Sequence, residues 1–222
     1  IGGFVGAAYS LGVPTYKMEK SALKFSLDKL ADFSVSKRSL LKGKKLEKII
    51  DEFINNKKFS DGRIPFAITA TDVETGDEIV YTKGDLKSIV KASCSWPGIF
   101  PPVLIDGKKL GDGGIRNSIP VKMARKLGAT KVIAVDIGFC AKKGKIENLF
   151  QLFIQSIQIL GEELDAYQAK EADITISPKL HNLDQLAFNR SKEAMQDGEA
   201  ATKKAMPAIR KLLGMNSRIW KY

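Results

Sequence analysis

The sequence predicts an α/β fold, and three observations support this prediction. Segments with the patterns of strands and helices alternate along the chain. The segment Lys131 to Gly138 (KVIAVDIG) is mostly apolar, as a central parallel strand buried on both faces should be. The chain has 222 residues, of which 44% are hydrophobic and 27% charged, so it is long enough to bury a sizeable core. We expect a single domain over residues 1–222.

The beginning of the chain is predicted to be helical. Residues 2–11 (GGFVGAAYSL) are rich in small side chains, which let a helix pack closely against a sheet, and Gly12 and Pro14 end that helix. Apolar residues at helical spacing follow within residues 16–60. They predict two or three helices that form a cap or flank.

The middle of the chain is predicted to form strands. Residues 64–73 (IPFAITATDV) are apolar and β-branched, and residues 78–84 (EIVYTKG) pair with them in a hairpin. A helix over residues 86–93 follows. The segment 103–114 (VLIDGKKLGDGG) predicts a second hairpin, which turns at Asp106-Gly107.

The last part of the chain alternates in the same way. An amphipathic helix over residues 121–127 ends at Gly128, a C-terminal glycine cap, and precedes the apolar strand 131–138. The richest apolar run, residues 149–160 (LFQLFIQSIQIL), is 12 residues long. Such a run is typical of core, although it also suits an acyl-chain trough or a lipid-docking surface. Residues 195–213 predict a final helix.

Charge and cysteine content restrict the partners and the compartment. Lysine and arginine number 36 against 25 acidic residues, a formal charge of +11, which favours anionic partners such as an acidic lipid surface that faces the cluster Lys37 to Lys45. No zinc pattern or RNA-binding signature accompanies this charge, so nucleic acid is not expected. Cys94 and Cys140 form neither a disulfide framework nor a metal knuckle, which fits a reducing, cytoplasmic location. No apolar run is long enough to span a membrane.

Two aspartates follow predicted strands. In α/β sheets, polar residues at the carboxyl ends of strands line the functional crevice. Asp112 and Asp136 both meet this description, and the glycines that surround Asp112 let another segment approach its carboxylate. The alternative is that Asp112 only binds backbone in its own turn.

The segment Ala92 to Gly138 resembles the signature block of the patatin-like phospholipases, of the bacterial type. The matching residues are Ala92-Ser93, Pro97, Phe100-Pro101-Pro102, Asp112-Gly113-Gly114, Asn117, Pro120 and Leu127-Gly128-Ala129. The resemblance extends over nearly the whole chain. It implies a three-layer hydrolase fold, in which helices flank a central, mostly parallel sheet.

The resemblance also implies a chemistry. Family members hydrolyse lipid acyl esters with a serine and an aspartate, and Asp112 of the motif completed by Gly113 and Gly114 would be that aspartate. The family's serine lies in Gly-x-Ser-x-Gly, with Gly2 as the last glycine, so we expect the serine immediately before Ile1. The preceding strand and oxyanion loop would lie further upstream, and the 222 residues alone would be inactive.

Other candidate nucleophiles and bases fit less well. His181 is the only histidine and lies in a polar loop, so a triad would have to use it. Ser93 and Ser95 lack the Gly-x-Ser-x-Gly surroundings, and Ser10 falls on the helix that follows. Cys94 has only Lys91 near it to lower the pKa of its thiol.

The sequence therefore predicts a serine acyl-ester hydrolase that acts on lipids, without a metal or other cofactor, and that associates peripherally with the inner membrane face. Its base would be Asp112, while Asp72 is expected to serve the first hairpin turn. A catalytically silent lipid- or membrane-binding protein of the same fold is the alternative.

Overall fold

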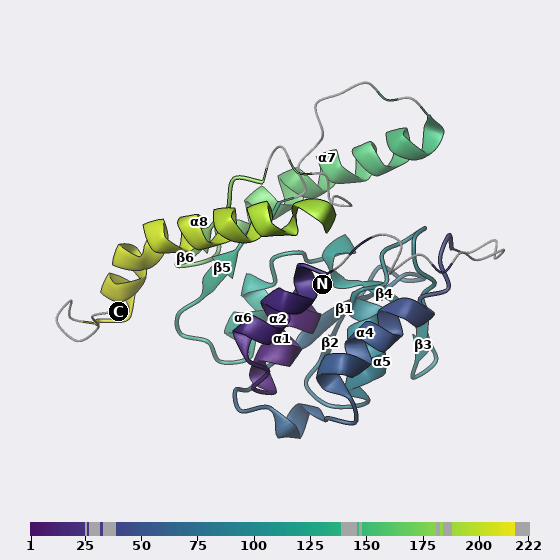
Figure 1. Ribbon diagram of the computed structural model, residues 1–222, viewed down its shortest axis with the longest axis horizontal. Coiled ribbons are helices and arrows are strands. Elements are labelled where there is room, and N and C mark those ends of the chain that lie inside the picture. The colour runs from purple at the N-terminus through teal and green to yellow at the C-terminus, as the bar shows by residue number, and fades with distance from the viewer. Residues whose placement is uncertain are drawn as a thin grey trace. The chain divides into compact units, whose positions relative to one another are not determined.

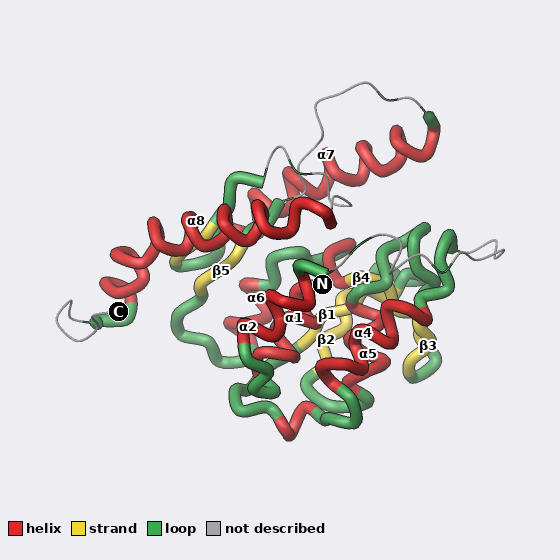
Figure 2. Tube along the Cα trace, in the orientation of Figure 1, coloured by secondary structure: helices red, strands yellow, loops and turns green. Residues whose placement is uncertain are grey.

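The computed structural model describes residues 1–24, 26, 32, 39–138, 146, 148–180, 183 and 188–215 (Figure 1). The chain forms two compact units, Ile1–Asn117 and Ser118–Tyr222. Helices and strands occur in both units, which confirms the α/β class (Figure 2). The expectation of one domain over the whole chain stays a prediction.

The first unit begins with helices, as predicted. These are α1 (Gly2–Ser10), α2 (Thr15–Ala22) and α4 (Lys44–Ile54). A short 3-10 turn, η1, covers Phe59–Asp61. Most of the segment between α2 and α4 lies outside the described residues.

The start of α4 is capped by a residue from another part of the chain. The Asp32 carboxylate accepts hydrogen bonds from four consecutive backbone amides, those of residues 42–45, at 2.7 to 3.2 Å. Partial burial raises the pKa of Asp32, but the four amides together lower it by more, so that the net pKa is below its usual range. Asp32 thus does for α4 what an N-cap side chain ordinarily does.

Four strands form the sheet of the first unit. They are β1 (Ile68–Asp72), β2 (Glu78–Tyr81), β3 (Val103–Ile105) and β4 (Lys108–Asp112), in the order β2-β1-β4-β3. Both predicted hairpins are present. The second turns where expected, with Asp106 and Gly107 at φ values of 50° and 77°, as a two-residue hairpin turn requires.

The direction of this sheet differs from the mostly parallel sheet that the resemblance implies. Each hairpin reverses the chain within a few residues, so its two strands are antiparallel. β1 also pairs with β4 in antiparallel fashion, with Ala70 opposite Asp112. All the strand pairs described in this unit are therefore antiparallel.

Helix α5 (Leu86–Ser93) packs against this sheet over the predicted range. Ala92 of α5 lies in a buried cluster with Ala70 of β1 and Leu110 of β4. Helix α5 also contacts α1 and α4. The carboxyl end of α5 consequently lies beside the end of β4, where Asp112 is located.

The second unit contains a parallel strand pair and three α-helices among its described residues. These are α6 (Val121–Lys126), β5 (Ile133–Val135), α7 (Leu149–Ala169), β6 (Ile174–Ile176) and α8 (Ser191–Leu212). α6 ends at Leu127, and Gly128 follows with a φ of 99°, as predicted for a glycine cap. The Asp173 carboxylate accepts from Arg125 and from the Val132 amide, each at 2.7 Å, and so links α6 to the strands.

Strand β5 is less buried than expected. Ala134 is 6% exposed and packs with Ile119, Val121 and Val132, whereas Val135 is 57% exposed. Because alternate residues of a strand point to opposite faces, the face with Ala134 is covered and the face with Ile133 and Val135 is partly open. An apolar groove of about 360 Å³ lies between the ends of these strands and α8.

The apolar run 149–160 is helical, as part of α7, but it is not core. Six large apolar side chains of α7 are between 47% and 80% exposed: Leu149, Leu152, Phe153, Ile159, Leu160 and Tyr167. None of the described helices has the length and apolar character needed to cross a bilayer.

Candidate active site

Asp112 is the last residue of β4, and its backbone is fixed on both sides. Its amide donates to the Ser95 carbonyl at 2.9 Å, and its carbonyl accepts from the Thr71 hydroxyl at 2.9 Å. One carboxylate oxygen, Oδ1, accepts from the Gly114 amide at 2.7 Å. The side chain is therefore held at a defined angle by its own loop, while the second oxygen, Oδ2, is free of that turn.

Gly113 lets the loop after Asp112 approach β1. A Cβ atom on Gly113 would lie 2.6 Å from both the carbonyl oxygen and the hydroxyl of Thr69. No real side chain tolerates such a contact with backbone, so only glycine fits here. The Asp-Gly-Gly sequence is thus required by packing as well as by the turn.

Helix α1 begins beside Asp112, although the two are far apart in sequence. Gly3 allows a close approach, because a Cβ there would lie 3.0 Å from Ile68 of β1 and 3.1 Å from the Ser93 hydroxyl of α5. Gly2 is the first residue of the helix, and a Cβ added to it would meet no described atom within 4 Å. The assignment of Gly2 to a nucleophile motif therefore stays a prediction.

The backbone nitrogen of Ile1 lies within electrostatic reach of Asp112 and is hydrogen-bonded to Cys94. The Ile1 nitrogen and the Asp112 carboxylate are therefore near enough to interact electrostatically.

Cys94 is a member of this site that sequence reasoning did not expect there. It follows α5 directly and is 3% exposed. Burial, with a smaller effect of Asp112, raises the pKa of its thiol. The thiol is thus protonated at neutral pH and is a poor nucleophile.

The other candidate serines are engaged in structural contacts. The Ser95 hydroxyl donates to the Lys91 carbonyl at 2.8 Å, and the Ser10 hydroxyl donates to the Ile64 carbonyl. Ser93 is buried behind Gly3. These positions agree with supporting roles for all three serines.

Asp72 and Asp136 form the same local hydrogen bond as Asp112. In each, Oδ1 accepts the amide two residues ahead, from Glu74 at 3.1 Å and from Gly138 at 2.9 Å. Asp72, which lies in the same unit as Ile1, is not among the groups that influence the Ile1 nitrogen. Asp112 differs from Asp72 in its electrostatic interaction with the Ile1 nitrogen.

Some sequence predictions cannot be compared with the structure. His181, Cys140 and the residues 37–38 of the basic cluster lie outside the described residues. Among the residues that are described, no group of three or more histidine, cysteine or acidic side chains is placed to hold a metal ion.

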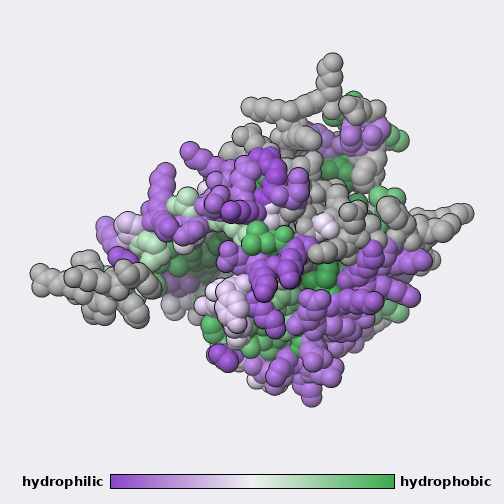
Figure 3. Space-filling view, viewed as in Figure 1, coloured by the Kyte–Doolittle hydropathy of each residue, from purple (hydrophilic) through white to green (hydrophobic). Residues whose placement is uncertain are grey.

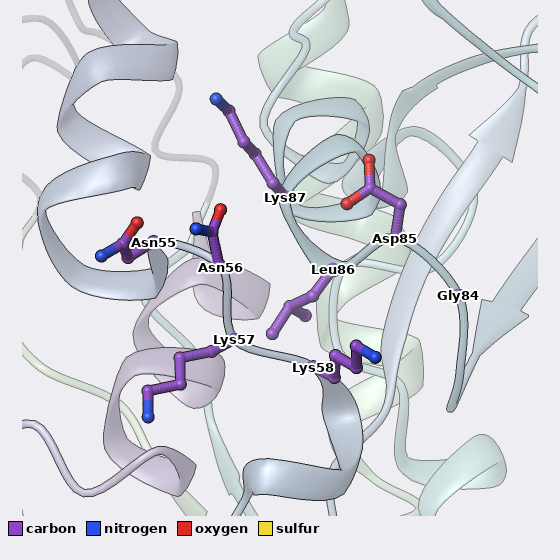
Figure 4. A pocket seen from close by; sticks show the side chains of 8 residues that line it. All are labelled: Asn55, Asn56, Lys57, Lys58, Gly84, Asp85, Leu86 and Lys87. Carbon is purple, nitrogen blue, oxygen red and sulfur yellow. The ribbon is translucent and has the colours of Figure 1, made fainter.

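A separate cavity of about 420 Å³ lies at the other end of α5. Figure 4 shows its lining, residues 55–58 after α4 and residues 84–87 at the start of α5. Lys87 points away toward α4, where it pairs with Asp51 at 2.7 Å and Glu47 at 3.2 Å. The whole helix α5, about 12 Å long by its eight residues, separates this cavity from Asp112, so the cavity is not part of the candidate site.

The comparison with known families decides the relationship. The family model described as patatin-like phospholipase matches residues 1–125, more than half of the chain. The chain belongs to the patatin-like phospholipase family. The match includes α1, the antiparallel sheet and Asp112, and it confirms the resemblance over residues 1–125. The resemblance of the later residues, which include Leu127-Gly128-Ala129 and residues 195–213, stays a prediction.

Individual relatives agree with this family. The chain is 29% identical over 138 residues to an uncharacterized NTE family protein of Mycobacterium tuberculosis, which covers 61% of this chain and 24% of the relative. It is 30% identical over 146 residues to the human patatin-like phospholipase domain-containing protein 6, which covers 62% of this chain and 11% of the relative. The chain thus spans about a quarter or less of the length of these relatives.

Proposed function

We propose that the chain contributes Asp112 as the general base of a serine acyl-ester hydrolase that acts on lipids. The serine is expected immediately before Ile1. The observation that supports this proposal most is the juxtaposition of the Asp112 carboxylate and the Ile1 nitrogen. Family membership supports the reaction class, a lipid hydrolase.

The proposed reaction begins with the removal of the serine proton. A hydroxyl becomes a good nucleophile when a positioned base accepts its proton. Oδ2 of Asp112 would accept it, because Oδ1 is already bound to the Gly114 amide at 2.7 Å. The serine oxygen then attacks the ester carbonyl. Asp112 would pass the proton on to the leaving oxygen, which departs as the alcohol.

The second half-reaction repeats these roles with water. Asp112 would deprotonate a water molecule that attacks the acyl-serine, and the serine would recover the proton as the fatty acid leaves. The first hydrogen bonds of α1 run from Phe4 and Val5 to the Ile1 carbonyl, so the amides of Gly2 and Gly3 are not used within the helix. The positive end of the helix dipole would favour the negative charge that develops at this end.

The rate of hydrolysis of a short-chain p-nitrophenyl ester tests the proposal. The protein used in this assay includes the sequence upstream of Ile1. We expect Asp112→Asn to lower kcat by about 10²- to 10⁴-fold, because the amide cannot accept the serine proton. Asparagine still offers Oδ1 to the Gly114 amide, so the melting temperature should change little.

Asp72→Asn and Asp136→Asn are the matched controls, since both remove a carboxylate with the same local hydrogen bond. Both should hydrolyse the ester at the parent rate. Equal activity of Asp112→Asn and the parent would remove Asp112 from the mechanism. An inactive parent would instead favour the alternative, a catalytically silent lipid-binding protein.

A further inference from the structure

A buried hydroxyl of β1 holds the backbone of Asp112. Thr71 Oγ1 donates to the Asp112 carbonyl at 2.9 Å, and the Asp112 amide donates to the backbone carbonyl of Ser95 at 2.9 Å. Thr71 and Ser95 are each 2% exposed. The surface in Figure 3, where purple hydrophilic residues lie beside green hydrophobic ones, is therefore formed almost wholly by other side chains. Thr71 contacts Asp112 but has almost no surface with which to contact a substrate.

Gly111 makes room for this contact. The strand register places Thr71 opposite Gly111, and the side chains of directly opposite residues lie on the same face of a sheet. A Cβ on Gly111 would lie 2.9 Å from Val73 Cγ1 and 3.4 Å from the Ser95 carbonyl oxygen, so a larger residue would displace these neighbours. The glycine before Asp112 therefore lets β1 and the segment after α5 both reach the Asp112 backbone.

The carbonyl of Asp112 is coupled to the direction of its carboxylate. A fixed carbonyl fixes the ψ angle of Asp112, which is 131°, and with it the path of the chain to Gly114. The Gly114 amide in turn donates to Oδ1 at 2.7 Å. A hydroxyl that holds the carbonyl therefore also controls, through Gly114, the direction of Oδ2, the proposed proton acceptor.

We propose that Thr71 is a positioning residue, whose hydroxyl holds Asp112 in the orientation that accepts the serine proton. This inference rests on the proposed function, in which Asp112 is the general base. Threonine suits the role because its β-branched side chain has a restricted χ1 angle, so the hydroxyl is already in place before a substrate binds. Loss of the hydroxyl would let the carboxylate turn away, and a displacement of about 1 Å costs about a hundredfold in rate.

Ester hydrolysis by variants that include the sequence upstream of Ile1 tests this role. Thr71→Val keeps the shape of the side chain and replaces the hydroxyl by a methyl group. We expect it to lower kcat for the short-chain p-nitrophenyl ester by about 10- to 100-fold, and to change KM by no more than about twofold, because Thr71 is shielded from the substrate. Thr71→Ser retains the hydroxyl and should keep kcat close to that of the parent.

Thr175→Val is the matched control. The Thr175 hydroxyl donates to the Ala169 carbonyl at 3.0 Å, a bond of the same kind that does not involve Asp112. Its loss should lower the melting temperature by an amount comparable to the loss of the Thr71 bond, but leave kcat at the parent value.

Two kinetic results would overturn the inference. One is a Thr71→Val variant with the kcat of the parent. The other is a Thr71→Ser variant that loses as much kcat as Thr71→Val, since that result would assign the effect to packing rather than to the hydroxyl. If Thr71→Val does not fold, the serine variant decides alone: a kcat near that of the parent supports the inference, and a large loss overturns it.

Hydrogen exchange at the Gly114 amide separates this inference from the proposed function. This amide donates to Asp112 Oδ1, so its exchange rate reports how firmly the carboxylate is held, whether or not the protein hydrolyses an ester. We expect exchange to be about 10-fold faster in Thr71→Val than in the parent, and unchanged in Thr71→Ser and Thr175→Val.

The exchange and hydrolysis results can fail independently. A parent that hydrolyses no ester would refute the proposed hydrolase, while faster exchange at Gly114 in Thr71→Val would still support the hold of Thr71 on Asp112. Unchanged exchange at Gly114 in Thr71→Val would overturn the inference and leave the proposed hydrolase as it stands.

Discussion

Replacing Gly113 by alanine tests how closely the loop after Asp112 is held against β1. The new Cβ would lie 2.6 Å from the Thr69 carbonyl oxygen, roughly 0.8 Å inside an ordinary contact. Thr69 is paired with Val80 in the sheet, so its backbone cannot retreat freely, and the loop must move instead. Such overpacking costs about 1–3 kcal/mol, which lowers the melting temperature by roughly 2–12 °C for a chain of this size.

The same movement should lower activity. Displacing a catalytic group by about 1 Å typically costs about a hundredfold in rate, and the Asp112 carboxylate would move with the loop. Thr69→Ala, added to Gly113→Ala, should not restore the rate, because the carbonyl oxygen remains in place. Thermal denaturation followed by circular dichroism and ester hydrolysis measure the two effects on one preparation.

Gly6→Ala is the control for this substitution. A Cβ at Gly6, in the middle of α1, would meet no described atom within 4 Å, so alanine should raise stability by about 0.5–1 kcal/mol. If Gly113→Ala melted and reacted like the parent, the close approach to β1 and the reasoning built on it would be refuted.

Three further predictions concern groups with shifted pKa values. Asp32→Asn should lower stability by about 1–2 kcal/mol at neutral pH. Because the folded-state pKa of Asp32 lies below its unfolded value, this contribution is present above about pH 4 and is lost as the pH falls through the folded pKa, so urea denaturation of variant and parent should converge in acid. The pKa of Asp173 is also lowered, first by the Val132 amide and then by Arg125. Asp173→Asn should therefore reduce the melting temperature at pH 7 and lose that effect in acid, whereas an effect that grows in acid would contradict the assignment. In a Cys140→Ser variant, the buried Cys94 thiol should react with a thiol reagent only after unfolding, and rapid reaction of the native protein would show that the site is open.

Much of the local structure could be predicted from the sequence. The two hairpins, α1, α5 and the Gly128 cap depend on neighbours along the chain, where turn residues and apolar periodicity act directly. Asp112 could also be singled out from its motif. The glycines beside Asp112 are a local signal in the sequence. The close approach of Gly113 to β1 explains why that residue must be glycine.

The tertiary structure decided what the chain brings together. The antiparallel pairing of β1 with β4, and the contact of α1 with α5, place Ile1 and Cys94 beside Asp112. Such contacts between distant segments result from packing, which a local pattern does not encode. The apolar run 149–160 likewise predicted a helix. Only the structure, in which Gln158 and Asp165 are buried, showed which side of α7 faces outward. The composition of a helix determines how apolar it is, whereas the packing of neighbouring elements determines which of its faces is covered.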